Sequence, residues 1–336
     1  MSAATAVPGP DARPEPPGDT AAAPAETGSV ETADEVPQLT PPPPPPDIVV
    51  EIFRLSENNF EGPFRRIAVE IQAMIDASGI GDQYNFLFLY NEQSSISETT
   101  SNKLYAEASS EFRDRAKPVF LLLHSKGGNP VPAYLISRYL KTSSPHGFVA
   151  VVPRKAKSAG TLIALGANQI HMGMMSELGP VDPQFRNLPA LGLGTALEYV
   201  AGVSERHPGA ADMLASFLEK TLSIQHLGLY ERVSESATHY AQKLLTRDGL
   251  SKESAEKVSH QLVYGYKDHS FAIDCDEIRS ILGDQIVKIE TAEYNLANRI
   301  HQYMERVNLA YGIFHRKYCS LIGRADGQSL EDLDTN

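Results

Sequence analysis

The sequence predicts an α/β domain with a mostly parallel sheet, and two observations support this fold class. Short apolar runs typical of buried strands occur at 119–123 and 148–152, with a third strand-like piece at 169–172. Helical patterns separate these runs, around 134–139 and over 161–167. Strands that alternate with helices at this spacing pair in parallel through right-handed crossovers.

The first 46 residues differ in composition from the rest of the chain. They hold 13 of the 23 prolines, seven acidic residues and one arginine, and they end in six consecutive prolines. Such a segment buries too little apolar surface to offset its ordering entropy, so we expect a disordered acidic arm at 1–46. We expect its proline run to be an extended spacer, and a partner that binds proline-rich segments is the alternative.

Composition narrows the class of protein. The net charge of −12 argues against a nucleic-acid partner, because phosphate binding needs a basic face. The two cysteines, Cys275 and Cys319, lack the spacing of a zinc site or a disulfide framework and fit a reducing compartment. The N-terminus has no signal-peptide features, and no apolar run approaches the roughly 18 residues of a membrane span. We therefore expect a cytoplasmic protein with no membrane span, metal or cofactor.

The remaining elements follow from local patterns. Alternating Ile48, Val50 and Ile52 predict an edge strand at 47–54, and glycines and prolines predict a loop at 184–194. Apolar periodicity and capping residues predict the other elements. In chain order these are a helix at 64–75, a strand at 86–90, a helix at 100–115, one or two helices at 210–245 interrupted near Gly228, a helix at 251–262, a turn at 265–269, a helix at 276–282, a final strand at 285–287, an amphipathic helix at 292–311 and a frayed tail at 325–336. We expect 47–290 to form the main domain and 291–336 a helical extension and tail.

Two loops of the central stretch carry residues suited to acyl transfer. Gly127-Gly128 follows one strand, Ser158 follows the next, and both fall at the carboxyl edge of a parallel sheet. The glycines let backbone amides approach a ligand, and a serine at a helix start lies beside unpaired amides. A nucleophile beside converging amides stabilises the charge that develops on a carbonyl oxygen. The alternative is that Ser158 is an N-cap and the glycines form a plain turn.

Four motifs extend this hypothesis. They are Ser-Lys-Gly-Gly at 125–128, Lys-Ser-Ala-Gly-Thr at 157–161, the segment Ser-Glu-Leu-Gly-Pro-Val-Asp-Pro-Gln at 176–184 and, more weakly, the segment from Gly265 to Ile273. On these motifs, over roughly residues 80–287, the sequence resembles the serine dehydrogenase proteinase family. That family belongs to the Clp-fold serine peptidases, with the Clp protease subunit, signal peptide peptidase A and the crotonases. The resemblance implies a Clp/crotonase-like fold with repeated β-β-α or β-α units and a serine peptidase activity.

The resemblance also implies roles for particular residues. It implies Ser158 as the nucleophile, His269 as the base and Asp182 as the residue that orients His269. The oxyanion donors that we expect are the amides of Gly128 and Ala159, with Gly127 supplying the bend. It further implies a peptide or protein substrate and, because relatives of this fold form rings or stacks, a homo-oligomer.

Several alternatives stay open at this point. His171 and His124 are further candidate bases, although a buried structural histidine explains His171 more simply. Signal peptide peptidase A uses a lysine base, and Lys220 and Lys243 lie on helical patterns where such a Ser-Lys dyad could form. A crotonase-like thioester enzyme would use the same amide pair, but we find no acidic pair placed for proton abstraction. A non-catalytic scaffold tethered by the proline-rich arm is the third possibility.

Overall fold

In the computed structural model of the protein, five parallel strands form the centre of a ten-stranded sheet. They are β1 (Asn85–Asn91), β2 (Val119–Ser125), β3 (Phe148–Val152), β5 (Gln169–Met172) and β10 (Val287–Ile289). Two antiparallel strands, β11 (Lys317–Gly323) and β12 (Gln328–Asp332), extend the sheet beyond β1. The order is β10-β5-β3-β2-β1-β11-β12. The predicted fold class, α/β with a mostly parallel sheet, is confirmed.

The structure describes residues 47–55, 60–110, 116–182, 184–185, 188–221, 224–246, 251–266 and 268–333. The expected arm at 1–46, with its proline run, lies outside these residues, as do the last five residues of the helix expected at 100–115. In the described part of the chain, no helix is both long and apolar enough to cross a bilayer.

A short branch of the sheet continues from the carboxyl end of β2 and carries the candidate site. Its strands are β4 (Lys155–Ala156), β6 (Glu177–Leu178) and β9 (Ile273–Asp274). Ala156 pairs with Ser125 of β2, β6 runs parallel to β4, and β9 runs antiparallel to β6. This branch brings three segments that are distant in the sequence to one edge of the sheet.

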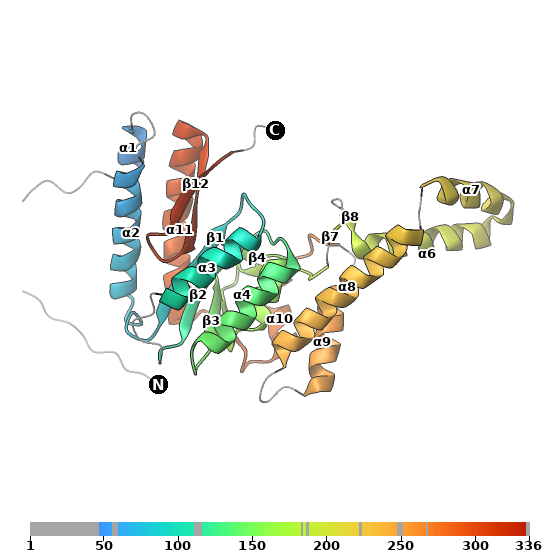
Figure 1. The fold of residues 1–336 in the computed structure, drawn as a ribbon, viewed down its shortest axis with the longest axis horizontal. Helices are drawn as coiled ribbons and strands as arrows, with labels where there is room; N and C mark the ends of the chain where they lie inside the picture. The colour runs from blue at the N-terminus through green and yellow to red at the C-terminus, as the bar shows by residue number, and fades with distance from the viewer. Residues whose placement is uncertain are drawn as a thin grey trace, which may run out of the picture. The chain divides into compact units, whose positions relative to one another are not determined.

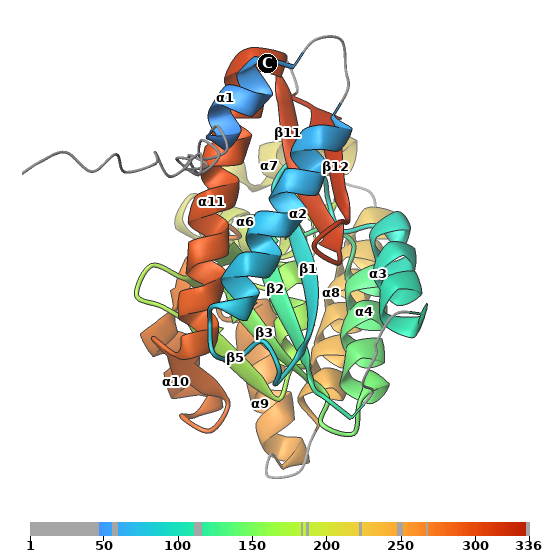
Figure 2. The ribbon, with the colours of Figure 1, turned by 90° about the vertical axis from the view of Figure 1, so that its left-hand side faces the viewer.

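Helices cover both faces of the sheet and form two apolar cores (Figure 2). Successive residues of β1 belong to different cores: Phe88 and Tyr90 to one, Leu87 and Leu89 to the other. Successive side chains of a strand point to opposite faces of the sheet, so this alternation shows that β1 is buried on both faces. The first core contains α1 (Ile48–Phe53), α2 (Glu61–Asp76) and α11 (Ala292–His315). The second contains α3 (Glu98–Ser110), α4 (Pro130–Ser143), α5 (Ala159–Leu165), α8 (Ile224–Leu245), α9 (Lys252–Tyr264) and α10 (Cys275–Leu282).

The helix α6 (Ala190–Arg206), which the sequence did not predict, follows the site, and α7 (Ala211–Thr221) falls within the helical stretch predicted at 210–245. A two-stranded hairpin of β7 (Gln184–Phe185) and β8 (Leu188–Pro189) leads into α6, so the loop predicted at 184–194 is wrong. The 3₁₀ turn η1 (Pro208–Ala210) and α7 come next, and this segment extends away from the sheet (Figure 1). The predicted interruption near Gly228 is also wrong, because α8 continues through this residue.

The edge strand predicted at 47–54 is the helix α1. Asp47 caps it, because its carboxylate accepts a hydrogen bond from Val49 N at 2.9 Å. The apolar residues Ile48 and Ile52 are four apart, and both are buried in the first core. That spacing fits one face of a helix as well as alternation in a strand, and only the packing partner decides between them.

The C-terminal predictions also need correction. The strand expected at 285–287 lies at Val287–Ile289 and is not the last, because α11 is followed by β11 and β12. Residues expected to fray at 325–336 include β12, which pairs with β11 over five residues, and 334–336 lie outside the described residues. Burial in β12 is only partial. An edge strand covered on one side has no continuous apolar run, so its sequence resembles that of a tail.

Candidate active site

Ser158 lies two residues after the end of β4, at the N-cap position of α5, with φ 49° and ψ −112°. Residues with a side chain rarely adopt this conformation. The surrounding backbone holds it in place, since Lys157 N donates to Ser125 O at 3.0 Å and Leu162 N donates to Ser158 O at 3.1 Å. Within the described part of the chain, the Ser158 side chain makes no capping hydrogen bond. Helix capping therefore does not explain this serine.

Replacing Ser158 by glycine is expected to stabilise the fold relative to Ser158→Ala. Glycine adopts positive φ without steric penalty, so it relieves strain of about 1–3 kcal/mol that alanine retains. The midpoints of thermal unfolding should differ by about 2–4 °C for each kcal/mol. Both variants lack the hydroxyl group, so equal midpoints would show that the backbone at residue 158 is not strained.

The glycine turn lies against Ser158. Gly127 and Gly128 have φ values of 104° and 151°. A methyl group at Gly127 would lie 2.8 Å from Lys157 O and 2.9 Å from Ser158 Cβ, and one at Gly128 would lie 2.3 Å from Ile96 N. No side chain fits at either position without moving the backbone that surrounds it. The close approach of the turn to Ser158 therefore requires both glycines.

Hydrogen bonds set the direction of the amides in this turn. Ile96 N donates to Gly127 O at 2.9 Å. Because a trans peptide points its C=O and N–H in opposite directions, the Gly128 N–H points away from Ile96. Gly127 N donates to Ser125 Oγ at 3.1 Å, so this amide is already engaged. Ala159 is the first residue of α5, where a helix has no internal acceptor for an amide. Gly128 and Ala159 are therefore the candidate oxyanion donors.

Asp182 and His269, 87 residues apart in the sequence, come together in the fold. His269 Nδ1 lies 3.9 Å from Asp182 Oδ2. Asp182 is buried, and the residue before it is anchored because Val181 N donates to Leu262 O at 2.9 Å. His269 lies in the turn after α9 and is half-buried. The separation exceeds a hydrogen bond, as is common for catalytic pairs without a bound substrate.

Burial is the main cause of a lowered pKa at His269. The positive charge of Lys157 lowers the pKa further, whereas the negative charge of Asp268 opposes the shift. A histidine whose pKa lies below its ordinary value of 6.5 is neutral at pH 7, as a general base must be.

One cavity of about 990 Å³ collects these groups. The sequence-predicted residues that line it are Gly127, Gly128, Ser158, Ala159 and His269. Sequence reasoning missed two further parts of its wall, the loop that opens α3 and the residues Val233 and Ala237 of α8. Ser97 and Thr100, three residues apart, are the sequence signal for a helix start in that loop, because Ser97 N donates to Thr100 Oγ1. The α8 residues carry no such signal, because only packing turns that face toward the cavity.

The two alternative histidines lie elsewhere. His171 is buried, with Nδ1 2.8 Å from Thr291 Oγ1 and 3.4 Å from Glu293 Oε2. His124 is also buried, with Nε2 2.5 Å from Glu92 Oε1. Neither histidine lines the cavity beside Ser158. Both hold secondary-structure elements together rather than facing the serine.

Neither lysine considered for a Ser-Lys dyad is placed to act as its base. Lys220 on α7 and Lys243 on α8 are exposed to solvent, and neither lines the cavity of Ser158. A lysine base needs a desolvated environment that keeps its amine neutral. The positions of these residues therefore do not favour the Ser-Lys alternative.

Comparison with known proteins adds an independent observation. Residues 109–311, more than half of the chain, match the family described as ClpP-like SDH-type serine proteinase. The chain belongs to this family. The matched range includes the glycine turn, Ser158, Asp182 and His269.

Two curated relatives of this chain are uncharacterised proteins of Methanocaldococcus jannaschii. One is 29% identical over 180 residues, which cover 54% of this chain and 57% of the relative. The other is 25% identical over 188 residues, which cover 56% of each chain. The alignments thus span little more than half the length of these relatives.

Two solved structures also show similarity to this chain. A mutant of the 1510-N membrane-bound stomatin-specific protease, in complex with a substrate peptide, is 13% identical. The match covers 76% of this chain and 94% of that one, with a TM-score of 0.39. ClpP1 from Listeria monocytogenes is 15% identical over 66% of this chain and 98% of its own, with a TM-score of 0.36. At these identities the likeness concerns the fold alone.

Proposed function

We propose that this protein hydrolyses peptide bonds through an acyl-enzyme on Ser158. The observation that carries the proposal is the shared cavity, which Ser158, His269 and the glycine turn all line. The Ser158 hydroxyl makes no helix-capping hydrogen bond, and its backbone is strained. Strained backbone conformations recur at functional sites. A peptide substrate and self-association, which the resemblance implies, belong to the same proposal.

In the proposed reaction, Ser158 Oγ attacks the substrate carbonyl carbon while His269 takes the hydroxyl proton. Asp182 faces Nδ1 of His269, which leaves Nε2 for the serine. The Gly128 and Ala159 amides donate to the oxyanion, each contributing about 3 kcal/mol. The C–N bond then breaks and His269 protonates the leaving amine. A water molecule, deprotonated by His269, then attacks the ester carbon, the bond from that carbon to Ser158 Oγ breaks, and His269 returns the proton to Oγ as the acid is released.

A fluorophosphonate probe tests this assignment. We expect the full-length protein to form one covalent adduct, which mass spectrometry of the digested protein should place on Ser158. An adduct on another serine would move the nucleophile. A chain that stays unlabelled, whether it is monomeric or assembled, would contradict the proposed peptidase mechanism.

The pH dependence of kcat/KM gives a second test. His269 acts as a base only when neutral, so activity is expected to fall as the pH drops through its pKa. Because burial lowers that pKa below 6.5, the acidic limb should have its midpoint below pH 6.5. Hydrolysis of a peptide substrate between pH 4 and pH 8 would measure it. A midpoint above 6.5 would argue against His269 as the base.

A further inference from the structure

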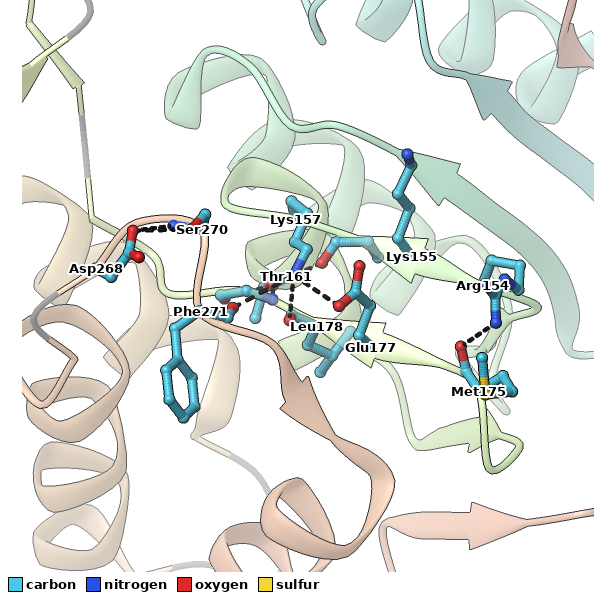
Figure 3. Close-up of polar contacts among 12 residues, drawn as sticks. Arg154, Lys155, Lys157, Thr161, Met175, Glu177, Leu178, Asp268, Ser270 and Phe271 are labelled. Carbon is cyan, nitrogen blue, oxygen red and sulfur yellow. Dashed lines mark hydrogen bonds and ion pairs between the residues drawn. The ribbon is translucent and has the colours of Figure 1, made fainter.

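The side chain of Lys157 joins three segments of the candidate active site (Figure 3). Its Nζ lies 3.0 Å from Glu177 Oε2 and donates to Leu178 O and Phe271 O, each at 3.3 Å. An ammonium group has three protons, so these three acceptors satisfy it completely. The side chain is only 17% exposed, and a cation that is largely withdrawn from water needs such partners.

Each of these contacts connects to a candidate catalytic residue. Lys157 immediately precedes Ser158, and Leu178 lies on β6, which leads through a short loop to Asp182. Phe271 is two residues after His269, in the segment that enters β9. One ammonium group therefore ties the segments of the nucleophile, the acid and the base together.

The lysine stem has a defined path to this position. A methyl group on Gly179 would lie 2.7 Å from Lys157 Cδ, so the stem packs against Gly179, just after β6, where there is no side chain. Thr161 secures the same place, because Gly179 N donates to its hydroxyl at 3.0 Å. The charged end of Lys157 is thus held by packing along its length as well as by its three acceptors.

The charges around His269 give Lys157 a second effect. Among the residues that the structure describes, the charged groups close to the imidazole are Asp182, Asp268 and Lys157. The ammonium group disfavours a second positive charge nearby, so it favours the neutral imidazole. Lys157 does not line the cavity of Ser158, so direct contact with a substrate is not expected.

We infer that Lys157 is a positioning residue: it fixes the segment 269–271 against β4 and β6 and thereby keeps the His269 imidazole in place beside Ser158. This inference rests on the proposed function, because it assigns the purpose of the fixed geometry to catalysis. The effect of Lys157 on the pKa of His269 is measurable without any peptidase activity.

The first measurement is the pKa of His269 in the full-length protein. The imidazole proton signals are followed by NMR between pH 4 and pH 8. The signals of His269 are identified as those that are missing from the spectrum of His269→Gln. In Lys157→Met, which keeps the apolar stem and removes the charge, the pKa of His269 is expected to rise toward 6.5. Lys157→Gln, which keeps a donor for one carbonyl, should give the same direction if the methionine variant does not fold. Lys157→Arg keeps the charge and should leave the pKa lowered.

Lys155→Met is the matched control. Lys155 lies on the same short strand, but its Nζ pairs with Glu92 Oε1 at 2.9 Å, away from His269. This variant removes the same charge and should not change the pKa of His269. A rise of equal size in Lys155→Met and Lys157→Met would overturn the inference, and so would a pKa that stays unchanged in both neutral Lys157 variants.

The second measurement is the rate of fluorophosphonate labelling together with peptide hydrolysis. Lys157→Met is expected to lower kcat by about 100-fold, because a displacement near 1 Å has that effect on a positioned catalytic group. KM should change little, since the side chain does not line the cavity. An unaltered kcat with a raised KM would contradict a positioning role. If the wild-type protein is not labelled at all, the proposed function fails, whereas the NMR titration still decides whether Lys157 controls His269.

Discussion

Ser158→Ala is expected to lower kcat for peptide hydrolysis by about a million-fold. The remaining rate is the rate of an enzyme without its nucleophile. This loss is about 8 kcal/mol of transition-state stabilisation. It is large because the hydroxyl is the atom that becomes acylated, and no other group can replace it from the same position. The amides of Gly128 and Ala159 should provide whatever acceleration remains, since their geometry does not depend on the hydroxyl group.

Steady-state hydrolysis of a peptide mixture, with products identified by mass spectrometry, measures this effect. Ser236→Ala is a suitable control, because Ser236 is exposed on α8 and its hydroxyl only donates to Arg232 O within the helix. The control should retain wild-type activity. Comparable activity in Ser158→Ala and wild type would place the catalytic nucleophile at another residue.

His269→Ala is expected to lower kcat by about 10,000-fold to a million-fold and to slow probe labelling strongly. A serine hydroxyl is a weak nucleophile until a base removes its proton, so the same side chain is needed for both reactions. Because alanine is smaller and His269 is only half-buried, we expect the variant to fold. The acidic limb of the pH profile should also disappear from the residual activity.

His146→Ala provides the matched control, because His146 is an exposed histidine at the opposite end of the sheet strands, just before β3. Its removal should change neither labelling nor hydrolysis. Rapid labelling that persists in His269→Ala would show that a different residue activates Ser158. His124 and His171 would not explain such a result, since each is buried against partners of its own.

Local sequence predicted the elements whose environment is uniform along their length. Strands β2 and β3 are buried on both faces, so their continuous apolar runs mark them without knowledge of their neighbours. The helix α9 carries its own start signal, because Ser251 accepts a hydrogen bond from Ser254 N at 3.1 Å. In contrast, α1 and β12 are each covered on one side, and their patterns do not distinguish helix, strand and tail.

The same distinction applies to the candidate site. The motifs around Gly127 and Ser158 are visible in the sequence because each needs special residues at fixed local positions: glycines where φ is positive and small residues beside the serine. The backbone conformation of Ser158 is held by the bond from Lys157 N to Ser125 O on one side and by the start of α5 on the other, so the sequence predicted the residue but not its backbone.

By itself, the sequence determined the fold class, the order of the central strands and helices, and the residues that could carry out acyl transfer. Only the tertiary structure decided which of them meet. The 3.9 Å approach of His269 to Asp182, the engagement of the Gly127 amide by Ser125 and the three contacts of Lys157 all join segments distant in the chain or depend on exact turn geometry. Contacts of this kind arise from how β4, β6 and β9 pair at the end of β2, and no local pattern encodes that pairing.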